Sequence, residues 1–453
     1  LMYAYDKPYV VNPSAGEESL EAKRPLVDNG LDVPHPERYY SPEFMKLEWR
    51  RLWPTVWLLA GVTSDVKEEG DYIVFDIGHE SIVLVRQKDG SVKAFHNVCP
   101  HRGNKIALND MGSVDRFTCA FHSWKFCLDG KLECITDEES FHPSLIAHRP
   151  GLSEVRCDTI GGLIFINLDG KAPPLKEWIG LPEGYIENYE IDKMNVVRHV
   201  RTEWHGNWKG GVDAFYETYH LPHIHPQTQG VMEDYSQYDL YPNGFSRMIV
   251  PICTKSHRIE DQETVSPDLM YMMQEAGMDP AAYQGSARGV RAAVQQAKRN
   301  RAERLGLTHY EKFEDGQLTD SWATGLFPNV QIGMHPEGVF IMRFLPHPTE
   351  PERFYYDNMT LFRYVDDKDY FVPGWMGLPK DTDVTGDTRP AIESFDITQR
   401  ADLGPVLNQD VELVLNRSRW WRAWFRWCFR PATARRRTVP SASSSWAGRR
   451  CVC

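Results

Sequence analysis

Residues 99–124 of the sequence read CPHRGNKIALNDMGSVDRFTCAFHSW and contain two short pairs of metal-ligating residues. Cys99 and His101 form a Cys-x-His pair, and Cys119 and His122 form a Cys-x-x-His pair after a 17-residue spacer. Thiolates and imidazoles are ligands of both zinc and iron–sulfur centres. The stretch therefore predicts a metal site built from two loops, holding either a single zinc ion or a two-iron cluster.

The mixed composition of each pair favours the two-iron cluster. Zinc fingers that use two cysteines and two histidines usually place both cysteines in one pair and both histidines in the other. In a Rieske [2Fe–2S] centre two thiolates hold one iron and two imidazoles hold the other, so each mixed loop supplies one ligand to each iron. We interpret Cys99, His101, Cys119 and His122 as Rieske ligands, with a zinc site as the alternative.

Composition narrows the class of protein. The 453 residues are enough for two domains, and the net charge of −12 argues against a nucleic-acid binder. No apolar run approaches the length of a membrane span, and the first residues, LMYAYDKPYVV, lack a secretory signal pattern. Nine cysteines are too sparse for a disulfide scaffold. We therefore expect no membrane contact and a reducing, cytoplasmic setting.

Short apolar runs surround the cluster motif and predict a small β domain over residues 50–165. Strands are expected at 71–77, 81–87, 92–98 and 162–169. The stretch KFCLDGKLEC at 125–134 predicts a hairpin with Asp129-Gly130 at its turn. Cys127 and Cys134 lie in this hairpin, and we interpret them as small packed side chains and not as further ligands.

A second motif, NWKGGVDAFYETYHLPHIHP, occupies residues 207–226. It predicts a helix from Trp208 to Tyr219 that breaks at Pro222, so that Asp213, Glu217 and His220 share one helical face. His220 and His225, joined by a distant carboxylate, would form the facial triad that leaves coordination positions on iron open. Histidines of an ordinary surface loop are the alternative.

Together the two motifs resemble the α subunit of Rieske non-haem iron oxygenases, also called aromatic-ring-hydroxylating oxygenases, over roughly residues 40–415. The shared signatures are C-x-H-x17-C-x2-H and N-W-K followed by Y-H-x4-H. The resemblance implies that His220 and His225 bind a mononuclear Fe(II) and that His223 does not. It also implies an aspartate near the end of the catalytic domain as third ligand, where Asp410 after Gln409 fits better than Asp402.

The sequence departs from most of these relatives at two positions. Glu217 stands where most have an aspartate that links the first iron histidine to the Rieske histidine of a neighbouring subunit, and some relatives that act on quaternary amines share this glutamate. We expect Glu217 to keep this bridging role, because a carboxylate accepts a hydrogen bond from each of two imidazoles. Asp213 stands where many relatives have asparagine, and it is a further candidate catalytic residue.

The resemblance implies an α+β fold with an all-β Rieske domain and a helix-grip catalytic domain built on an antiparallel sheet. We expect an N-terminal arm and helix packed on the catalytic domain over 1–49, the Rieske domain over 50–165, the catalytic domain over 166–415 and a basic tail over 416–453. Strands at 338–348 and 353–365 are expected to be neighbours. The charged helical run at 287–306 is either solvated surface, a lid over the active site, or a docking face for a reductase.

The implied function is that of the oxygenase component of a multicomponent system. Electrons from NAD(P)H would arrive through a reductase, with or without a ferredoxin, and O2 would hydroxylate a small aromatic or other organic substrate. The product would be a cis-dihydrodiol, or a monohydroxylated compound that loses a methyl group. Phe215, Tyr216 and Leu221 would line the pocket or pack in the core. The expected assembly is a homotrimer, with or without β subunits, and the alternative is a Rieske electron-transfer protein without oxygenase activity.

Overall fold

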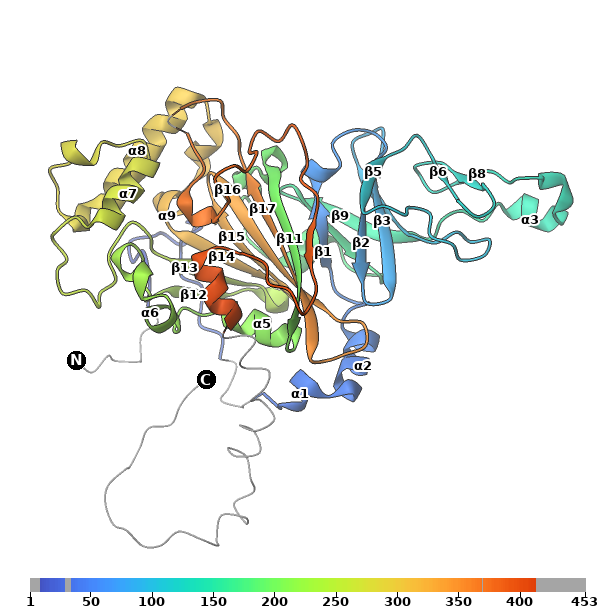
Figure 1. Cartoon of the computed structure of the whole chain (residues 1–453), viewed down its shortest axis with the longest axis horizontal. Helices are drawn as coiled ribbons and strands as arrows, with labels where there is room; N and C mark the ends of the chain where they lie inside the picture. Colours follow the sequence, from blue (N-terminus) through green and yellow to red (C-terminus); the bar gives the residue numbers. More distant parts are fainter. Residues whose placement is uncertain (1–8, 29–33, 369, 413–453) are drawn as a thin grey trace, which may run out of the picture.

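The chain, described here from a computed structural model that covers residues 9–28, 34–368 and 370–412, is elongated, with a narrow β-rich end and a wide end built on one large sheet (Figure 1). The predicted basic tail at 416–453 lies outside these residues. Among the described residues no helix combines the length and the apolar character needed to cross a bilayer.

The narrow end consists of two sheets. A seven-stranded sheet has the order β1-β10-β9-β4-β3-β2-β5, and a three-stranded sheet has the order β6-β7-β8. The strands are β1 (Leu58–Val62), β2 (Asp71–Ile77), β3 (Glu80–Arg86), β4 (Val92–His96), β5 (Met111–Ser113), β6 (Phe117–Thr118), β7 (Lys125–Phe126), β8 (Leu132–Cys134), β9 (Glu154–Ile160) and β10 (Leu163–Asn167). All their pairings are antiparallel.

The strands predicted from the apolar runs are present, and β7 and β8 form the predicted hairpin. Gly130 occupies its turn with φ +84°, and the ring of Phe95 lies where a Cβ at this position would stand. Glycine is therefore required there both for the backbone conformation and for the close approach. One short helix, α3 (Pro143–His148), interrupts the otherwise all-β domain.

The wide end is built on an eight-stranded sheet of order β12-β13-β14-β15-β16-β17-β11-β18. Its strands are β11 (Asn195–His205), β12 (Gln237–Leu240), β13 (Ser246–Val250), β14 (Ser321–Leu326), β15 (Val330–His335), β16 (Gly338–Pro346), β17 (Arg353–Phe362) and β18 (Glu393–Phe395). The predicted neighbours β16 and β17 pair antiparallel in register. The edge strand β18 pairs parallel with β11, which the sequence did not predict.

Most helices surround this large sheet (Figure 1). They are α1 (Glu37–Tyr40), α2 (Pro42–Arg51), α4 (Leu175–Ile179), α5 (Trp208–Phe215), α6 (Leu221–Ile224), α7 (Pro267–Glu275), α8 (Val290–Leu305) and α9 (Asp315–Thr319), and residues 405–412 form a further helix. Of these, α6, α7, α8 and α9 lie on the side away from the narrow end (Figure 1). The N-terminal helix α2 is tied to α5 by a buried ion pair of 2.7 Å between Glu48 and Lys209. The predicted charged helix at 287–306 is α8.

Alternate residues of β16 serve the two faces of the sheet, as the pleat of a strand requires. Val339 and Ile341 point into one core, which also contains Trp57 and Phe165 of the narrow end. On the other face Phe344 packs against α5, where Gly211 leaves room for the ring because a Cβ there would lie 2.7 Å from it. The NWKGG stretch thus brings α5 close to the sheet.

Helix α5 ends earlier than the sequence predicted. It begins at its N-cap Asn207, whose side-chain oxygen accepts a hydrogen bond from the Lys209 amide, and it ends at Phe215, with Tyr216 as the C-cap. The hydroxyl of Tyr216 donates to the Val330 carbonyl at 2.8 Å and fixes this end to β15. The prediction that Asp213, Glu217 and His220 share one helical face is therefore wrong, because Glu217 and His220 follow the helix.

A buried ion cluster joins the narrow end to the large sheet. The Asp357 carboxylate of β17 is fully buried and accepts hydrogen bonds from Arg343 (2.6 Å) and Arg201 (2.8 Å). The second terminal nitrogen of Arg343 donates to the Leu59 and Ala60 carbonyls of β1 at 3.3 and 2.8 Å. Burial acts to raise the pKa of Asp357, but Arg343, His199 and Arg201 hold it well below its usual range.

Replacing Asp357 with asparagine should lower the free energy of unfolding by about 3–5 kcal/mol, because Arg343 and Arg201 would keep buried charges without their counter-charge. Urea unfolding followed by tryptophan fluorescence measures this change. In the control Glu133→Gln, which breaks an ion pair whose side chains are 48 % and 39 % exposed, the loss should stay below about 1 kcal/mol. Equal effects in the two variants would contradict a joining role for Asp357.

Candidate metal centres

The two cluster loops have the same backbone construction. In each loop the amide four residues after the cysteine donates to the cysteine carbonyl, from Gly103 at 3.0 Å and from Ser123 at 2.8 Å. Both of these residues have positive φ, +78° and +58°. The amides of Cys99 and Cys119 in turn donate to the carbonyls of Asn104 and Trp124 at 2.8 and 2.9 Å. The two loops therefore make the same turn, which directs both toward a common point. Glycine is favoured at a residue with positive φ, and only the first loop has a glycine at this position.

The four side chains of these loops suit a two-iron cluster. Cys99 and Cys119 are each 2 % exposed, and the two thiols contact each other. The rings of His101 and His122 lie with centroids 4.7 Å apart, and His101 stacks on Trp124 at 4.6 Å. The Nδ1 atom of His122 is buried without a hydrogen-bond partner in the described part of the chain. A buried ring nitrogen of this kind is costly unless it binds a metal or a donor, so the residues present fit the cluster.

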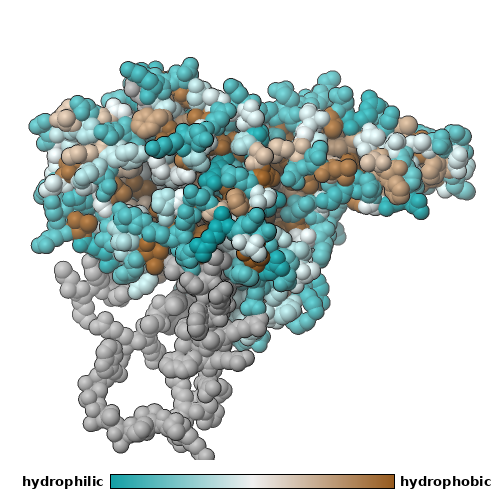
Figure 2. Space-filling model, in the orientation of Figure 1, coloured by the Kyte–Doolittle hydropathy of each residue, from teal (hydrophilic) through white to brown (hydrophobic). Residues whose placement is uncertain are grey.

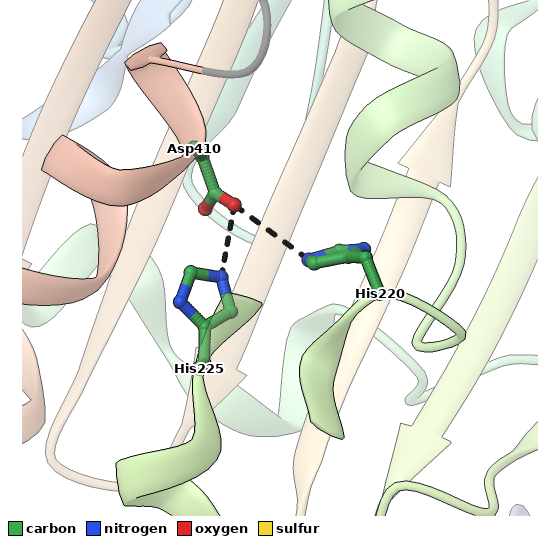
Figure 3. A group of neighbouring side chains, drawn as sticks. All are labelled: His220, His225 and Asp410. Carbon is green, nitrogen blue, oxygen red and sulfur yellow. Dashed lines mark hydrogen bonds and ion pairs between the residues drawn. The ribbon is translucent and has the colours of Figure 1, made fainter. Parts of the chain in front are cut away.

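Three residues of the wide end meet at a second centre (Figure 3). His220 and His225 flank the single turn of α6 as its N-cap and C-cap residues, and Asp410 approaches from the helix at 405–412. The Oδ1 atom of Asp410 lies 2.9 Å from Nε2 of His225 and 3.6 Å from Nε2 of His220. One ligand atom of each residue lies within 4.8 Å of the other two. Two imidazoles and one carboxylate so placed have the composition of the facial triad of non-haem iron.

A second layer of hydrogen bonds orients both imidazoles. The Nδ1 atom of His220 lies 2.6 Å from Oε1 of Glu217, and Nδ1 of His225 lies 2.7 Å from Oε1 of Gln409. Gln227 donates to the same oxygen of Gln409 at 2.7 Å, which sets the orientation of that amide. Because each Nδ1 is engaged, each Nε2 is left to face Asp410. In the sequence Gln409 was only a marker for Asp410, and no sequence signal pointed to Gln227.

The hydrogen bonds within this layer also set the charge states. Burial alone would lower the pKa of His225, but its bonds to Asp410 and Gln409 raise it overall. Burial would raise the pKa of Glu217, but the ring and backbone N–H groups of His220 lower it overall. Glu217 therefore stays ionised near neutral pH and acts as an acceptor toward the first histidine.

The other sequence candidates lie apart from the triad. The Asp213 carboxylate is exposed and accepts a hydrogen bond from the Tyr39 hydroxyl at 2.6 Å. Asp402 is exposed, and its carboxylate accepts from Asn408 (2.8 Å) and from the Gly404 amide (3.0 Å) at the start of the last described helix. His223, between the two triad histidines, is also exposed. The structure thus brings Asp410, and not Asp402, to the two histidines.

A cavity of about 460 Å³ opens from the triad along one face of the large sheet. The strands contribute alternate residues, among them Met248 of β13, Ala323 of β14, Gly333 of β15 and Phe340 of β16, which form one cross-strand row. Phe215 and Leu221, two of the three predicted pocket residues, line the cavity. Its size and its mostly apolar lining are typical of a small-molecule site.

Helix α8 forms part of the wall of this cavity. Val294 and Lys298, four residues apart on the helix, both line it. The side chain of Lys298 is 13 % exposed and pairs with the buried Glu337 at 2.8 Å. The basic residues of α8 are therefore not all solvated surface, because some of them turn inward.

A second group of possible ligands, Glu233, Asp234 and His257, is a network of internal bonds. The Glu233 carboxylate accepts from the ring of His257 at 2.7 Å, and Asp234 pairs with Arg258 at 2.8 Å. Arg258 supplies the positive charge that a cation would bring, so we assign no metal to this group.

The cluster loops and the triad lie far apart within the chain. The first loop follows β4 and the second joins β6 to β7 in the narrow end, whereas α6 lies on the far side of the large sheet (Figure 1).

Comparison with known families gives two matches. The model for the Rieske [2Fe-2S] domain matches residues 56–148, and the model for the ring hydroxylating alpha subunit catalytic domain matches residues 191–416. The chain belongs to the Rieske oxygenase α-subunit family. The family has a [2Fe–2S] cluster in the first domain and a mononuclear iron in the second, which confirms a two-iron cluster over a zinc ion, and the four named ligands stay a prediction.

Curated relatives match parts of the chain. The glycine betaine monooxygenase oxygenase subunit of Chromohalobacter salexigens is 29 % identical over 236 residues, 52 % of each chain. The biphenyl dioxygenase subunit alpha of Paraburkholderia xenovorans is 35 % identical over 174 residues, 37 % of this chain and 38 % of that one. The chain thus spans about half the length, or less, of the curated relatives it matches.

Solved structures share the fold. A quaternary ammonium Rieske monooxygenase in complex with L-carnitine aligns with a TM-score of 0.57 at 18 % identity, covering 85 % of this chain and 84 % of that one. Naphthalene 1,2-dioxygenase from Rhodococcus sp., bound to indole, aligns with a TM-score of 0.60 at 19 % identity, covering 86 % and 82 %.

The variant His101→Cys should keep a two-iron cluster but lower its reduction potential by on the order of 100 mV, because a thiolate adds negative charge where a neutral imidazole stood. A redox titration of the visible absorbance measures the potential. His96→Cys, a short distance before the first loop on β4, is the control and should leave the potential unchanged. An unchanged potential in His101→Cys would remove His101 from the ligand set.

The variant Asp410→Ala should lose the mononuclear iron and keep the absorbance of the Rieske cluster, because it removes the only carboxylate within the described triad. Iron analysis of the purified protein, with the cluster quantified by its spectrum, measures both. Asp402→Ala is the matched control on the same segment and should keep both centres. Full iron occupancy in Asp410→Ala would place the third ligand elsewhere.

Proposed function

We propose that the chain is the oxygenase component of a multicomponent Rieske oxygenase, which uses O2 and electrons from NAD(P)H to hydroxylate a small organic substrate. The observation that carries the proposal is the triad of His220, His225 and Asp410 at one end of an apolar cavity, in a chain that also has a Rieske domain. A Rieske electron-transfer protein without oxygenase activity has no use for such a triad and cavity.

The contacts of the described residues support the following roles. Cys99, His101, Cys119 and His122 hold the cluster, and His220, His225 and Asp410 hold the mononuclear iron. When bound, the cluster supplies electrons and the iron supplies the O2-activating chemistry. Glu217 and Gln409 keep the two triad imidazoles in position, and the apolar wall of the cavity keeps bulk water from the substrate.

The reaction is either the cis-dihydroxylation of an arene or a monohydroxylation followed by loss of a methyl group. Both have precedent in the names of the relatives, which include a biphenyl dioxygenase and a glycine betaine monooxygenase. A reductase, with or without a ferredoxin, delivers the electrons, and the cytoplasm is the compartment that supplies NAD(P)H.

The assembly belongs to the proposal, because the two centres lie at opposite ends of one chain (Figure 1). A head-to-tail homotrimer, with or without β subunits, would bring the cluster loops of one chain to Glu217 of the next. Two exposed aromatic residues support these surfaces as contacts: Phe121, beside His122, is 57 % exposed, and Tyr219, beside His220, is 83 % exposed. Apolar atoms are also exposed along the narrow end (Figure 2).

Product analysis tests the proposed activity. The purified chain is incubated with a generic reductase, NADH, 18O2 and a panel of arenes, aryl acids and N-methyl compounds, and products are identified by mass spectrometry. At least one compound should gain 18O, and the Asp410→Ala variant should give none. NADH oxidation without any labelled product, across the panel and with both centres loaded, would favour the electron-transfer alternative.

The variant Glu217→Gln should keep both metal centres but slow electron transfer between them by about 10–100-fold, because the neutral amide loses the negative charge of the carboxylate and has an N–H donor in place of one of its two acceptor oxygens. Single-turnover oxidation of the pre-reduced cluster gives the rate, with iron content and trimer mass measured in parallel. Glu311→Gln, an exposed glutamate of the same domain, is the control. A wild-type rate in Glu217→Gln, or full activity of a monomer, would contradict the inter-subunit bridge.

A further inference from the structure

The end of the cavity away from the triad is polar, although most of the lining is apolar. Gln331, Gly333 and His335 are alternate residues of β15, and all three line the cavity. Gln331 lies at the triad end, where its side-chain amide donates to the carbonyl of Phe215 at the end of α5. His335, four residues further along the strand, lies about 13 Å away. The cavity therefore runs along β15 from the triad to His335.

His335 is a buried polar side chain with unused hydrogen-bonding capacity. It is 6 % exposed, and its ring packs against Trp375 with centroids 4.1 Å apart and the ring planes tilted by 31°. Within the described residues its ring nitrogens make no hydrogen bond to the protein. Burial, and then the charge of Lys298, lower the pKa of His335 to about 3, so the ring is neutral near pH 7 and one nitrogen carries a hydrogen that it can donate.

Lys298 supplies a cation at the same end. Its ammonium group has three N–H donors, and the contacts described above use one of them, toward Glu337. Arg301 also donates to the same oxygen of Glu337 at 3.1 Å, so one carboxylate faces two cations. The two cations of this group exceed its one carboxylate, and the Glu275 carboxylate at the same end of the cavity balances the remaining charge.

The other carboxylate that lines this end, Glu275, is already engaged. It accepts hydrogen bonds from the Gly374 amide and the Tyr271 hydroxyl, which ties α7 to the segment at 373–377. A cationic group entering here would meet the ammonium group of Lys298, and the Glu275 and Glu337 carboxylates that also line this end already accept hydrogen bonds or pair with a cation. An acidic group would find donors on Lys298 and His335.

We infer that Lys298 and His335 form a subsite for the carboxylate of a substrate whose apolar body extends along β15 to the triad. The small side chain of Ala323 and the absence of one at Gly333 leave room for that body in the cross-strand row between the two ends. The substrate class is an aryl or alkyl carboxylic acid with a body on the order of 10 Å. This inference rests on the proposed function, because it treats the cavity as the substrate site of the triad.

Binding by the full chain, without reductant, tests the subsite independently of turnover. The probes are benzoate, biphenyl-4-carboxylate and octanoate, each compared by isothermal titration calorimetry with its uncharged primary amide, and with a trimethylammonium compound of the same body. At least one acid should bind at least tenfold more tightly than its amide, and the trimethylammonium compounds should bind most weakly. No preference for any acid, or tighter binding of a trimethylammonium compound, would overturn the inference even if every variant failed to fold.

Three variants assign the preference to the subsite. Lys298→Met should reduce the acid-to-amide ratio at least tenfold, and Lys298→Arg should largely keep it. His335→Phe should reduce the ratio while keeping an aromatic ring packed against Trp375. Arg304→Met is the matched control: it removes a cation from the last turn of the same helix, where it pairs with Asp367, and should leave the ratio unchanged. An acid-to-amide ratio that is unchanged in Lys298→Met, or that falls equally in Arg304→Met, would overturn the assignment.

The outcome separates the subsite from the proposed activity. An acid that binds with the expected preference but gains no 18O in the product analysis would leave the subsite standing and count against the oxygenase function. Labelled products formed only from uncharged or cationic compounds, with no acid preferred in binding, would leave the oxygenase function standing and overturn the subsite.

Discussion

The buried contact of Arg343 with Asp357 and with the backbone of β1 fixes how the two domains sit on each other. Asp357 is held by two arginines of neighbouring strands, and one of them reaches the Leu59 and Ala60 carbonyls of the Rieske domain. The network extends through His199, whose ring lies 3.2 Å from Asp357 and 2.9 Å from Arg389, and Arg389 pairs with Asp65 of the Rieske domain. Buried charges of this kind are costly unless each is paired, so the two domains have one favourable relative position.

That fixed position has a functional consequence. The Rieske domain packs against the face of the sheet that bears Arg343, and its cluster loops lie in the narrow end, away from the large sheet (Figure 1). The triad and the cavity lie on the other face. With the domain interface closed by buried ion pairs, no small rearrangement within one chain brings the loops to His220. The separation is the physical reason why the proposed mechanism needs a second copy of the chain, and why Glu217, at 37 % side-chain exposure, is placed where a partner can reach it.

The sequence predicted the local features well where short-range chemistry determines them. The alternating runs of β2, β3, β16 and β17 and the Asp129-Gly130 turn are each encoded within about ten residues, and the two ligand motifs within about 25. The sequence did not predict features that tertiary contacts determine. Helix α5 ends at Phe215 because the Tyr216 hydroxyl is bonded to β15, and β18 pairs in parallel with the distant strand β11. The choice of Asp410 over Asp402 depended on family resemblance, and the placement of Gln409 and Gln227 behind His225 could not be seen, because these residues are separated by 182 positions.

The pleat of β16 explains how one strand serves both domains without conflict. Val339, Ile341 and Arg343 face the core and the Rieske domain, whereas Phe340 and Met342 face the cavity. A substitution at Phe340 or Met342 changes the shape offered to a substrate but leaves the bonds of Arg343 to Asp357 and β1 in place, because neighbouring side chains of a strand project to opposite faces. Substrate choice can therefore vary in this architecture independently of the domain arrangement on which electron delivery depends. The same separation places Lys298 of α8 and His335 at the end of β15 where they can change without disturbing the triad or the cluster loops.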